Sequence, residues 1–407
     1  MIIVEFLDKS NIDNLCSSLI KAPERVIFVS SAKNGISLNL LDRYKRFFAG
    51  RGLDIICEGM SLNPFKIDKV TAAFERITEK YDECVFDLTG GNESYIVAAT
   101  AVATRYPERR IQLQKINIST GNVIDLDRDG KTILDSGSAP SLTVEETISI
   151  NGGRIVYEDE RTGGTHRWDD SVLDDVDVDV MWEIMRSSPT AWNSAVGVLE
   201  RFVRLDDGAL KSVRSGDPKL PSSIADSQPP VKKVFERLNN KGLIKVEESD
   251  GRETVTFATD TIERVLSKSG NLLELQVYRL AKRAENAGKK IFNDALTGVL
   301  IDIDGNEDDS MLLTNEIDVI IQKGLKPIFV SCKNGDVDND ELYKLRTVTA
   351  RFGGKYAKAV LVLAAPRGAV SSMSLKERAK EYHITVIEAY SMSDLKFAKR
   401  IAHLASS

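Results

Sequence analysis

The sequence predicts an α/β protein with three parts: a Rossmann-like domain, a winged-helix-like middle and a second α/β domain. The first and last thirds of the chain alternate short apolar segments with amphipathic ones, which is typical of strands and helices in turn. Between them, a helical segment precedes two short strand-like segments. With 407 residues, the chain is too long for one compact core. We place the domain boundaries at residues 1–140, 141–265 and 266–407.

The first domain alternates strand and helix from its start. The expected strands are residues 2–6, 25–29, 53–57, 84–88 and 111–116. The expected helices are residues 11–19, 40–49, 68–80 and 92–104. Strands that alternate with helices form a parallel sheet with right-handed crossovers. The carboxyl ends of these strands therefore meet at one edge, where open α/β sheets bind their ligands.

Three polar loops follow strands at this edge. In the last of them, two glycines between a strand and a helix allow close backbone approach, and the start of the helix offers unpaired N–H groups suited to phosphate. A tight turn capped by Asn92 explains that loop equally well, but three polar loops on one edge favour a nucleotide site. The candidate ligand residues are Asp8, Lys9, Ser10, Asn11, Ser30, Ser31, Thr89, Gly90, Gly91 and Asn92.

The middle part combines turn-rich, acidic and helical segments. Residues 147–168 contain turn signals and predict a β-hairpin, and the acidic run at residues 169–179 predicts a solvated connector. Residues 231–238 have helical apolar spacing and precede Lys241-Gly242 and two strand-like segments, which is the pattern of a winged helix. Because acidic residues surround it and DNA-binding modules are usually basic, we expect a spacer.

The last domain has acidic residues and a lysine in an order suited to phosphodiester hydrolysis. This reaction benefits from a cation that neutralises developing charge and lowers the pKa of a water molecule. Mg²⁺ prefers carboxylates, carbonyl oxygens and water as ligands. The candidate catalytic residues are Glu274, Asp318, Ser331 and Lys333. The candidate ligands of Mn²⁺ or Mg²⁺ are Glu274, Asp318 and the backbone carbonyl of Cys332.

The strand that contains Asp318 holds a second acid. Glu316 lies two residues earlier and faces the same side of the strand, so it is a weaker candidate for the same site. A helix is expected downstream, at residues 340–352. The alternative to a catalytic site is a structural ion pair between Asp318 and Lys333 in an inactive domain.

Taken together, these motifs resemble the CARF-domain ancillary nucleases of type III CRISPR systems. The resemblance covers essentially the whole chain and is carried by Thr89-Gly90-Gly91, Gly270-Asn271-Leu272-Leu273-Glu274, Asn315-Glu316-Ile317-Asp318-Val319 and Phe329-Val330-Ser331-Cys332-Lys333. It implies a CARF sensor of cyclic oligoadenylate and a restriction-endonuclease-like PD-(D/E)xK domain. The usual motif reads Glu-x-Lys where this chain has Ser331-Cys332-Lys333, so one carboxylate is missing.

The resemblance also implies a function in antiviral defence. We expect a metal-dependent endonuclease that cleaves single-stranded RNA and/or DNA and is allosterically activated by cyclic tetraadenylate bound across a homodimer. A two-fold ring suits an isologous dimer. The alternative is a ligand-responsive transcription regulator, in which the winged helix binds DNA and the nuclease-like domain is inactive.

Composition and charge limit the other possibilities. The net charge is −6, but residues 268–407 hold 21 Lys and Arg against 18 Asp and Glu, so a mildly basic last domain can approach phosphate backbones. No apolar run reaches the ~20 residues that span a bilayer. The four cysteines are widely spaced and the first residues form an apolar strand rather than a targeting signal, so we expect a cytoplasmic protein without disulfides or a membrane segment.

Overall fold

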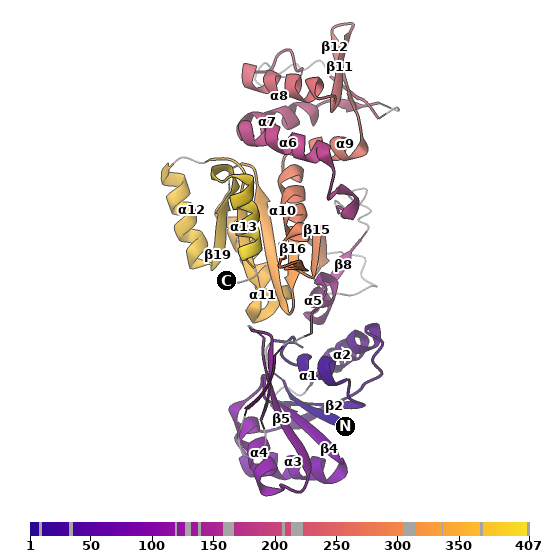
Figure 1. Ribbon diagram of the computed structural model, residues 1–407, viewed down its shortest axis with the longest axis vertical. Helices are drawn as coiled ribbons and strands as arrows, with labels where there is room; N and C mark the ends of the chain where they lie inside the picture. The colour runs from indigo at the N-terminus through magenta and orange to yellow at the C-terminus, as the bar shows by residue number, and fades with distance from the viewer. Residues whose placement is uncertain are drawn as a thin grey trace.

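Three units follow one another along the longest axis of the protein (Figure 1). The computed structural model describes residues 1–7, 10–31, 36–118, 120–126, 132–136, 140–157, 167–205, 208–212, 223–303, 314–335, 337–366 and 369–404. The first domain lies at one end, the last domain in the middle and the winged-helix-like part at the other end. The order in space therefore differs from the order in the sequence, although the α/β fold class is as expected.

The first domain, here called the sensor domain, is built on a seven-stranded sheet of order β3-β2-β1-β4-β5-β6-β7. The strands are β1 (Ile2–Phe6), β2 (Arg25–Ser31), β3 (Ile56–Leu62), β4 (Glu83–Asp87), β5 (Arg110–Asn117), β6 (Asn122–Leu126) and β7 (Thr132–Ser136). The five strands β3, β2, β1, β4 and β5 are parallel, as predicted. The strand order reverses between β1 and β4, so the loops after these two strands flank the switch point of the sheet.

Helices cover both faces of this sheet. They are α1 (Cys16–Lys21), α2 (Leu38–Gly50), α3 (Ile67–Lys80) and α4 (Glu93–Arg105). One apolar core lies between the sheet and α1 and α2, and a second lies between the sheet and α3 and α4. The predicted first helix was wrong at its start, because residues 11–15 form turns before α1. The third strand begins three residues later than expected.

The last domain, here called the nuclease-like domain, has a six-stranded sheet of order β19-β18-β17-β16-β15-β8. Its strands are β15 (Asp294–Asp302), β16 (Thr314–Lys323), β17 (Lys326–Lys333), β18 (Lys358–Leu363) and β19 (Ile384–Glu388), with a small ribbon of β13 (Glu285–Asn286) and β14 (Lys289–Lys290). Its helices are α10 (Asn271–Arg283), α11 (Asn339–Gly353), η2 (Gly354–Tyr356), α12 (Ala369–Glu381), η3 (Ala389–Ser391) and α13 (Asp394–His403). The strands β15, β16 and β17 form an antiparallel meander, and β17, β18 and β19 are parallel.

The β-hairpin expected at residues 147–168 was wrong for the described part of that segment. Helix α5 (Val144–Ile150) forms there instead, with Thr143 and Glu146 making a capping box, and its buried residues include Val144 and Ile148 at helical spacing. The following strand β8 (Arg154–Val156) pairs with β15 and so extends the nuclease-like sheet. Residues 158–166 lie outside the described part of the chain.

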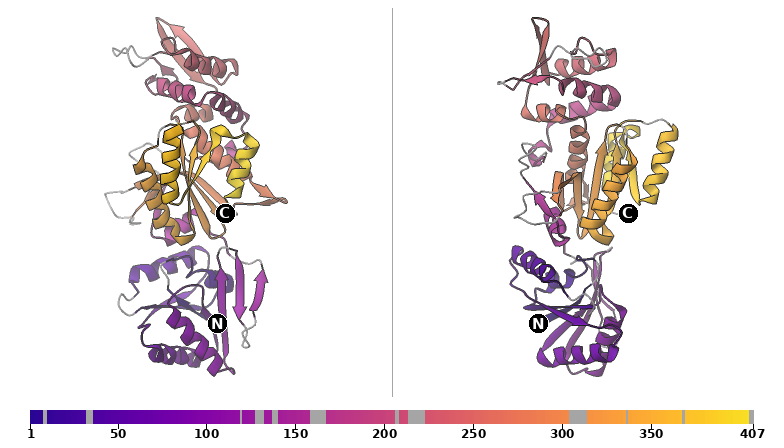
Figure 2. Two further views of the ribbon diagram at one scale, coloured as in Figure 1. Left: turned by 90° about the vertical axis from the view of Figure 1, so that its left-hand side faces the viewer. Right: turned by 180° about the vertical axis from the view of Figure 1, so that it is seen from behind.

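The winged-helix-like part has the predicted helix and wing. Its helices are η1 (Asp170–Val172), α6 (Val176–Ser187), α7 (Pro189–Leu199), α8 (Pro229–Asn240) and α9 (Asp260–Leu266), and its strands are β9 (Val203–Arg204), β10 (Leu210–Lys211), β11 (Ile244–Ser249) and β12 (Arg252–Phe257). Figure 2 shows this part at the end of the molecule opposite the sensor domain. The expectation that it separates the other two domains was therefore wrong, because α5 and β8 keep the chain beside the nuclease-like sheet before it continues to the far end.

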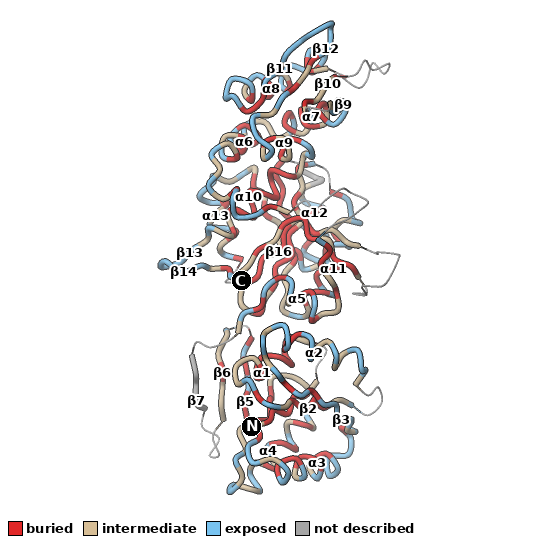
Figure 3. Tube along the Cα trace, turned by 90° about the vertical axis from the view of Figure 1, so that its right-hand side faces the viewer, coloured by how far each residue is buried: buried red, intermediate tan, exposed pale blue. Residues whose placement is uncertain are grey.

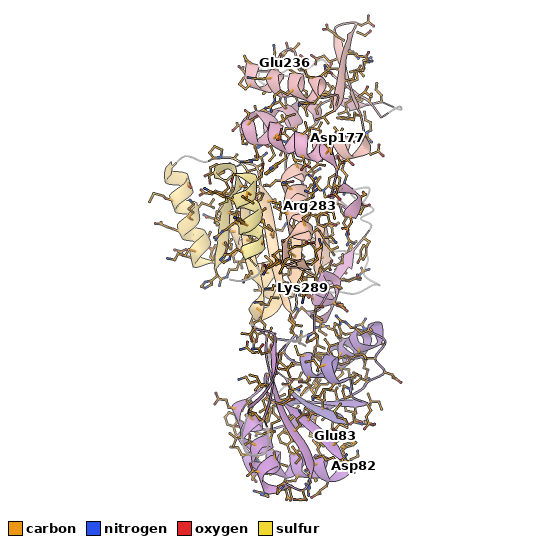
Figure 4. The ribbon with its side chains drawn as sticks, viewed as in Figure 1. Asp82, Glu83, Asp177, Glu236, Arg283 and Lys289 are labelled. Carbon is orange, nitrogen blue, oxygen red and sulfur yellow. The ribbon has the colours of Figure 1, made fainter. Side chains whose placement is uncertain are left out.

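The acidic run keeps several carboxylates exposed, as expected of a solvated segment, but it is more than a connector, because it pairs with the basic end of α10 and continues into α6. Arg279 is fully buried and donates to the carbonyls of Leu173 (2.9 Å) and Asp175 (3.0 Å) and to the Asp179 carboxylate (2.9 Å). Arg283, labelled in Figure 4, pairs with Asp174 at 3.1 Å. Opposite charges at matching positions thus join the winged-helix-like part to the nuclease-like domain.

The sensor domain touches the nuclease-like domain directly. Leu325, in the turn between β16 and β17, is buried in the same core as α1 and α2. Figure 3 shows the buried strand β16 in the body above this junction and α1 and α2 below it. Within the described residues, no helix combines the length and the apolar character that crossing a bilayer requires.

Candidate active site

The predicted catalytic residues come together where the pairing of β16 and β17 ends. The last residue pair of this ladder is Val319 with Val330. Just beyond it, the Asp318 carboxylate accepts the backbone N–H of Cys332 at 2.6 Å and the hydroxyl of Ser331 at 3.2 Å. Because the ladder ends here, Asp318 has no paired residue on β17, and its carboxylate instead binds Ser331 and Cys332 at the end of that strand.

Glu274 joins this group from the first turn of α10. Its side chain is 3% exposed, and burial together with the negative charge of Asp318 raises its pKa to about 8. Burial also raises the pKa of Asp318, against the lowering effects of the Cys332 N–H and the charge of Lys333. Two buried carboxylates that disfavour each other's ionisation form a site that a cation stabilises.

Lys333 approaches the same site but pairs with a residue that the sequence did not single out. Its ammonium forms an ion pair with Glu341 on α11. Burial alone would lower the pKa of Lys333, but the hydrogen bond that its ammonium donates to Glu341 and the charge of Asp318 raise it. The direct ion pair between Asp318 and Lys333, on which the inactive alternative rests, is absent from the described residues.

Glu316 contributes a third acid at the edge of this site. Its Oε1 atom is buried and accepts no hydrogen bond, while the Lys268 ammonium lies 3.8 Å away. Its charge raises the pKa of both Glu274 and Asp318. Among the residues that the structure describes, no three or more His, Cys, Asp and Glu side chains converge into a metal cluster. A cation here needs water or backbone oxygens besides the carboxylates.

Cys332 supplies backbone groups, not a thiol. Its side chain is buried in the apolar core that includes Val330 and α10 residues. Burial and the charge of Asp318 raise the pKa of its thiol well above the usual value, so the thiol stays protonated. Its N–H already binds Asp318. The predicted ligand role of its carbonyl stays a prediction.

In the sensor domain, the loop after β4 is held by the sheet beneath it. The Thr89 N–H donates to the Asp87 carboxylate at 2.7 Å, and the Thr89 hydroxyl accepts the N–H of Ile116 at 2.9 Å. Gly91 has a φ of +89°, and a Cβ there would lie 2.2 Å from the Cβ of Phe6, so this position requires glycine. The turn thus lies against the end of β1, and both loops of the switch point lie together.

The other predicted ligand residues lie in different surroundings. Asn92 is the N-cap of α4 and accepts the N–H of Ser94. Ser10 is buried, and the amide of Asn11 donates to the carbonyl of Ile150 on α5 at 3.1 Å. Ser30 lies at the end of β2 with a buried hydroxyl oxygen that has no hydrogen-bond partner, and Ser31 is exposed. Asp8 and Lys9 lie outside the described residues.

The comparisons with known proteins bear on the fold. No family model and no curated protein matches the chain. Protein VC1899 from Vibrio cholerae is similar in structure, with a TM-score of 0.72, 16% identity and coverage of 99% of this chain and 97% of that one. The chain shares its fold with that protein.

Two further solved structures have the same architecture. Can2 from Sulfobacillus thermosulfidooxidans, solved in complex with cyclic tetra-adenylate, gives a TM-score of 0.65 at 17% identity, with coverage of 98% of this chain and 99% of that one. A type III CRISPR defence DNA nuclease activated by cyclic oligoadenylate gives 0.50 at 14% identity, with coverage of 93% of this chain. This chain matches 51% of that nuclease's length. The fold expected from the resemblance to CARF-domain nucleases is thus confirmed.

Proposed function

We propose that the protein is a metal-dependent endonuclease switched on by cyclic tetraadenylate in type III CRISPR defence. The observation that carries this proposal is the meeting of Glu274, Asp318 and Lys333 at the end of the β16–β17 ladder. Solved structures with this fold include one with bound cyclic tetra-adenylate and one described as a nuclease activated by cyclic oligoadenylate. Two copies of the chain would hold a two-fold ring between their sensor domains.

The residues present fit a hard cation such as Mn²⁺ or Mg²⁺. Glu274 and Asp318 are buried carboxylates with raised pKa values, and Glu316 has a buried oxygen without a hydrogen bond. Glu274, Asp318 and the carbonyl of Cys332 would hold the ion, and oxygen donors of this kind suit these metals. When bound, such a cation stabilises the charge that develops on the phosphate and makes water more acidic.

The chain's own groups would orient the substrate around that site. The Lys333 ammonium would stabilise negative charge on a phosphate oxygen; its position near the carboxylates, without an ion pair to Asp318, supports this role. The Ser331 hydroxyl, where the usual motif has a carboxylate, donates to Asp318 and so holds that carboxylate in place. The buried Cys332 N–H does the same from the backbone.

The test is a cleavage assay on labelled single-stranded RNA and DNA with Mn²⁺, with and without cyclic tetraadenylate. We expect cleavage only with the ligand, and the Asp318→Ala variant should bind the ligand without cutting either substrate. No cleavage of RNA or DNA under any condition contradicts the nuclease. Equal cleavage with and without the ligand contradicts the switch.

A further inference from the structure

Helix α11 contacts the candidate active site at one end and leads to the sensor domain at the other. Near its start, Glu341 pairs with Lys333. Directly after its last residue, the short helix η2 presents Lys355, which forms an ion pair with Asp13 of the sensor domain. At 1.5 Å per residue, the 15 residues of α11 span about 22 Å. One rigid element therefore lies between a sensor contact and the lysine of the site.

The sensor contact involves the loop that is predicted to bind the ligand. Asp13 lies in the turns between β1 and α1, three residues after Ser10, and is 1% exposed. Ser10 also lies close to η2. A Cβ added to Gly354 would lie 3.7 Å from the hydroxyl oxygen of Ser10. A shift of this loop on ligand binding therefore reaches residues 354 and 355 directly.

The end of α11 is packed tightly against the residues that follow it and against β17. A Cβ at Gly353 would lie 2.3 Å from the Cβ of Ala357 and 2.7 Å from the ring of Phe329. Phe352 is fully buried, and its carbonyl accepts the side-chain amide of Asn151 at 2.9 Å. Tightly packed interiors transmit displacement instead of absorbing it. A displacement at Lys355 is therefore passed to the helix.

At the other end, the position of the Lys333 ammonium depends on Glu341. The two side chains are half-buried, and the second oxygen of Glu341 is buried without a hydrogen-bond partner. No other ion pair of Lys333 is present in the described part of the chain. Lys333 is anchored by its backbone on β17, while Glu341 is carried by α11. A change in the position of the start of α11 relative to the end of β17 therefore changes where the ammonium lies.

We infer that helix α11 couples the sensor domain to the active site, with Lys355 as its contact to the sensor and Glu341 as the positioning residue of Lys333. The inference rests on the proposed function, since it assigns the route by which the ligand controls cleavage. Ligand binding favours one of two positions of the loop that contains Asp13, and the associated position of α11 places Lys333 for reaction. Glu341 acts through Lys333 and is not itself a catalytic residue.

The sensor end is tested with the variants Lys355→Met and Asp13→Asn in the full-length protein. The measurement is the ratio of the cleavage rates with and without cyclic tetraadenylate, in Mn²⁺. We expect each variant to reduce this ratio at least about fivefold, the lower range of allosteric coupling, and the double variant to reduce it no further. Lys355→Arg keeps the charge and should keep the ratio.

A matched control breaks a different contact at the same junction. Arg51, directly after α2, pairs with Glu146 of α5 at 2.5 Å, and neither residue belongs to α11. The Arg51→Gln variant should therefore keep the wild-type ratio. An equal loss in Arg51→Gln and Lys355→Met overturns the inference, because any loosening of the junction then suffices.

The catalytic end is tested with Glu341→Gln, which keeps the size of the side chain and removes its charge. We expect kcat to fall at least about tenfold with KM, melting temperature and ligand affinity unchanged, because only the placement of Lys333 is lost. Glu341→Asp should recover part of the rate. The neighbouring exposed residue Asp340 supplies the control Asp340→Asn, which should cleave like the wild type.

Two outcomes separate this inference from the proposed function. If the wild type shows ligand-dependent cleavage and Lys355→Met keeps the wild-type ratio, the inference fails alone. If the wild type does not cleave, hydrogen exchange of residues 339–356 with and without cyclic tetraadenylate still decides it. The coupling requires that cyclic tetraadenylate changes the hydrogen exchange of these residues in the wild type and does not change it in Lys355→Met. Unchanged exchange in both proteins overturns it.

Discussion

Both α/β domains bury neighbouring acidic residues near their candidate sites, but only the pair in the sensor sheet, Glu5 and Asp87, has several hydrogen-bond donors around it. Glu5 and Asp87 are direct neighbours on β1 and β4. The Ser17 hydroxyl reaches Asp87 at 2.5 Å, the Thr89 N–H reaches it at 2.7 Å, and Ser18 reaches Glu5 at 3.3 Å. A hydrogen bond also joins the two carboxyl groups.

The carboxylates of the nuclease-like domain have fewer donors. Asp318 accepts two hydrogen bonds, but no described group donates to Glu274, and one oxygen of Glu316 is buried without a partner. Buried polar atoms are nearly always satisfied, so exceptions beside a lysine point to a ligand that completes them. The sensor cluster is therefore expected to have a structural role, whereas the nuclease cluster has the unsatisfied polar atoms that the proposed binding of a cation would complete. Four predictions test this difference.

The largest effect is expected from Glu274→Gln in the nuclease cluster. The amide keeps the shape of the buried side chain but removes the charge that the proposed cation requires, so the cleavage rate falls at least about 100-fold. The rate is measured under single-turnover conditions with Mn²⁺ and cyclic tetraadenylate. Glu285, an exposed acid just beyond α10, supplies the control Glu285→Gln, which should cleave normally. A rate for Glu274→Gln close to wild type would exclude Glu274 from the site.

The next effect concerns the sensor cluster and should appear in stability. Asp87→Ala leaves the Thr89 N–H without its acceptor and leaves the Ser17 hydroxyl with Gln114 alone, so the free energy of unfolding should fall by about 1–3 kcal/mol. Urea unfolding monitored by circular dichroism measures it. Asp82→Ala, at an exposed position labelled in Figure 4, should change stability by less than about 0.5 kcal/mol. Equal stability of the two variants would contradict the structural role.

Mn²⁺ should stabilise the nuclease cluster and not the sensor cluster. At a concentration of 100 times Kd, one bound ion adds about 2.7 kcal/mol to the wild type, which is several degrees in melting temperature. The increase should be lost in Glu274→Gln and retained in Asp87→Ala. Differential scanning fluorimetry in EDTA and in Mn²⁺ measures the melting temperature of each protein without and with the metal. A wild-type melting temperature that does not respond to Mn²⁺ or Mg²⁺ argues against the proposed metal site.

The smallest effect is a pH dependence of the sensor cluster. Burial and the charge of Asp87 raise the pKa of Glu5 well above its usual value. Folding therefore takes up a proton once the pH exceeds the unfolded pKa of about 4.5, and the stability of the wild type falls as the pH rises. Glu5→Gln needs no proton and still donates to Asp87, so its stability should match that of the wild type at pH 4 and exceed it increasingly as the pH rises to 8. A constant difference across this range would show that Glu5 does not titrate.

Much of the site could be predicted because its residues belong to regular elements with clear patterns. Apolar residues around Asp318 and before Ser331 predicted two successive strands, and a reversal between them brings their ends together. The helix around Glu274 and the helix at residues 340–352 were also predicted within a few residues. Local periodicity therefore sufficed to place the catalytic candidates.

The arrangement of the parts could not be predicted, because it depends on contacts between distant segments. The capping pattern of Thr143 and Glu146 was present in the sequence and indicates a helix, but glycines nearby favoured a hairpin. The pair of Lys333 and Glu341 requires α11 to fold back along β17, which spacing alone does not show. Likewise, the acidic run has the composition of a solvated segment. Its contact with α10 is seen only in the structure, where the buried Arg279 binds Asp179.

The buried Arg279 also determines where the chain can be divided. A fragment that begins at residue 266 would lose the carbonyls of Leu173 and Asp175 and the Asp179 carboxylate that bind the guanidinium, together with the segment that carries them. The apolar side chains of α10 that share a core with α6 would then face water, so such a fragment should be less stable and prone to aggregate. It would also lose β8 and so expose β15 as a bare edge strand. The nuclease-like domain is therefore discontinuous in sequence, and a fragment that contains all of it has to start before α5.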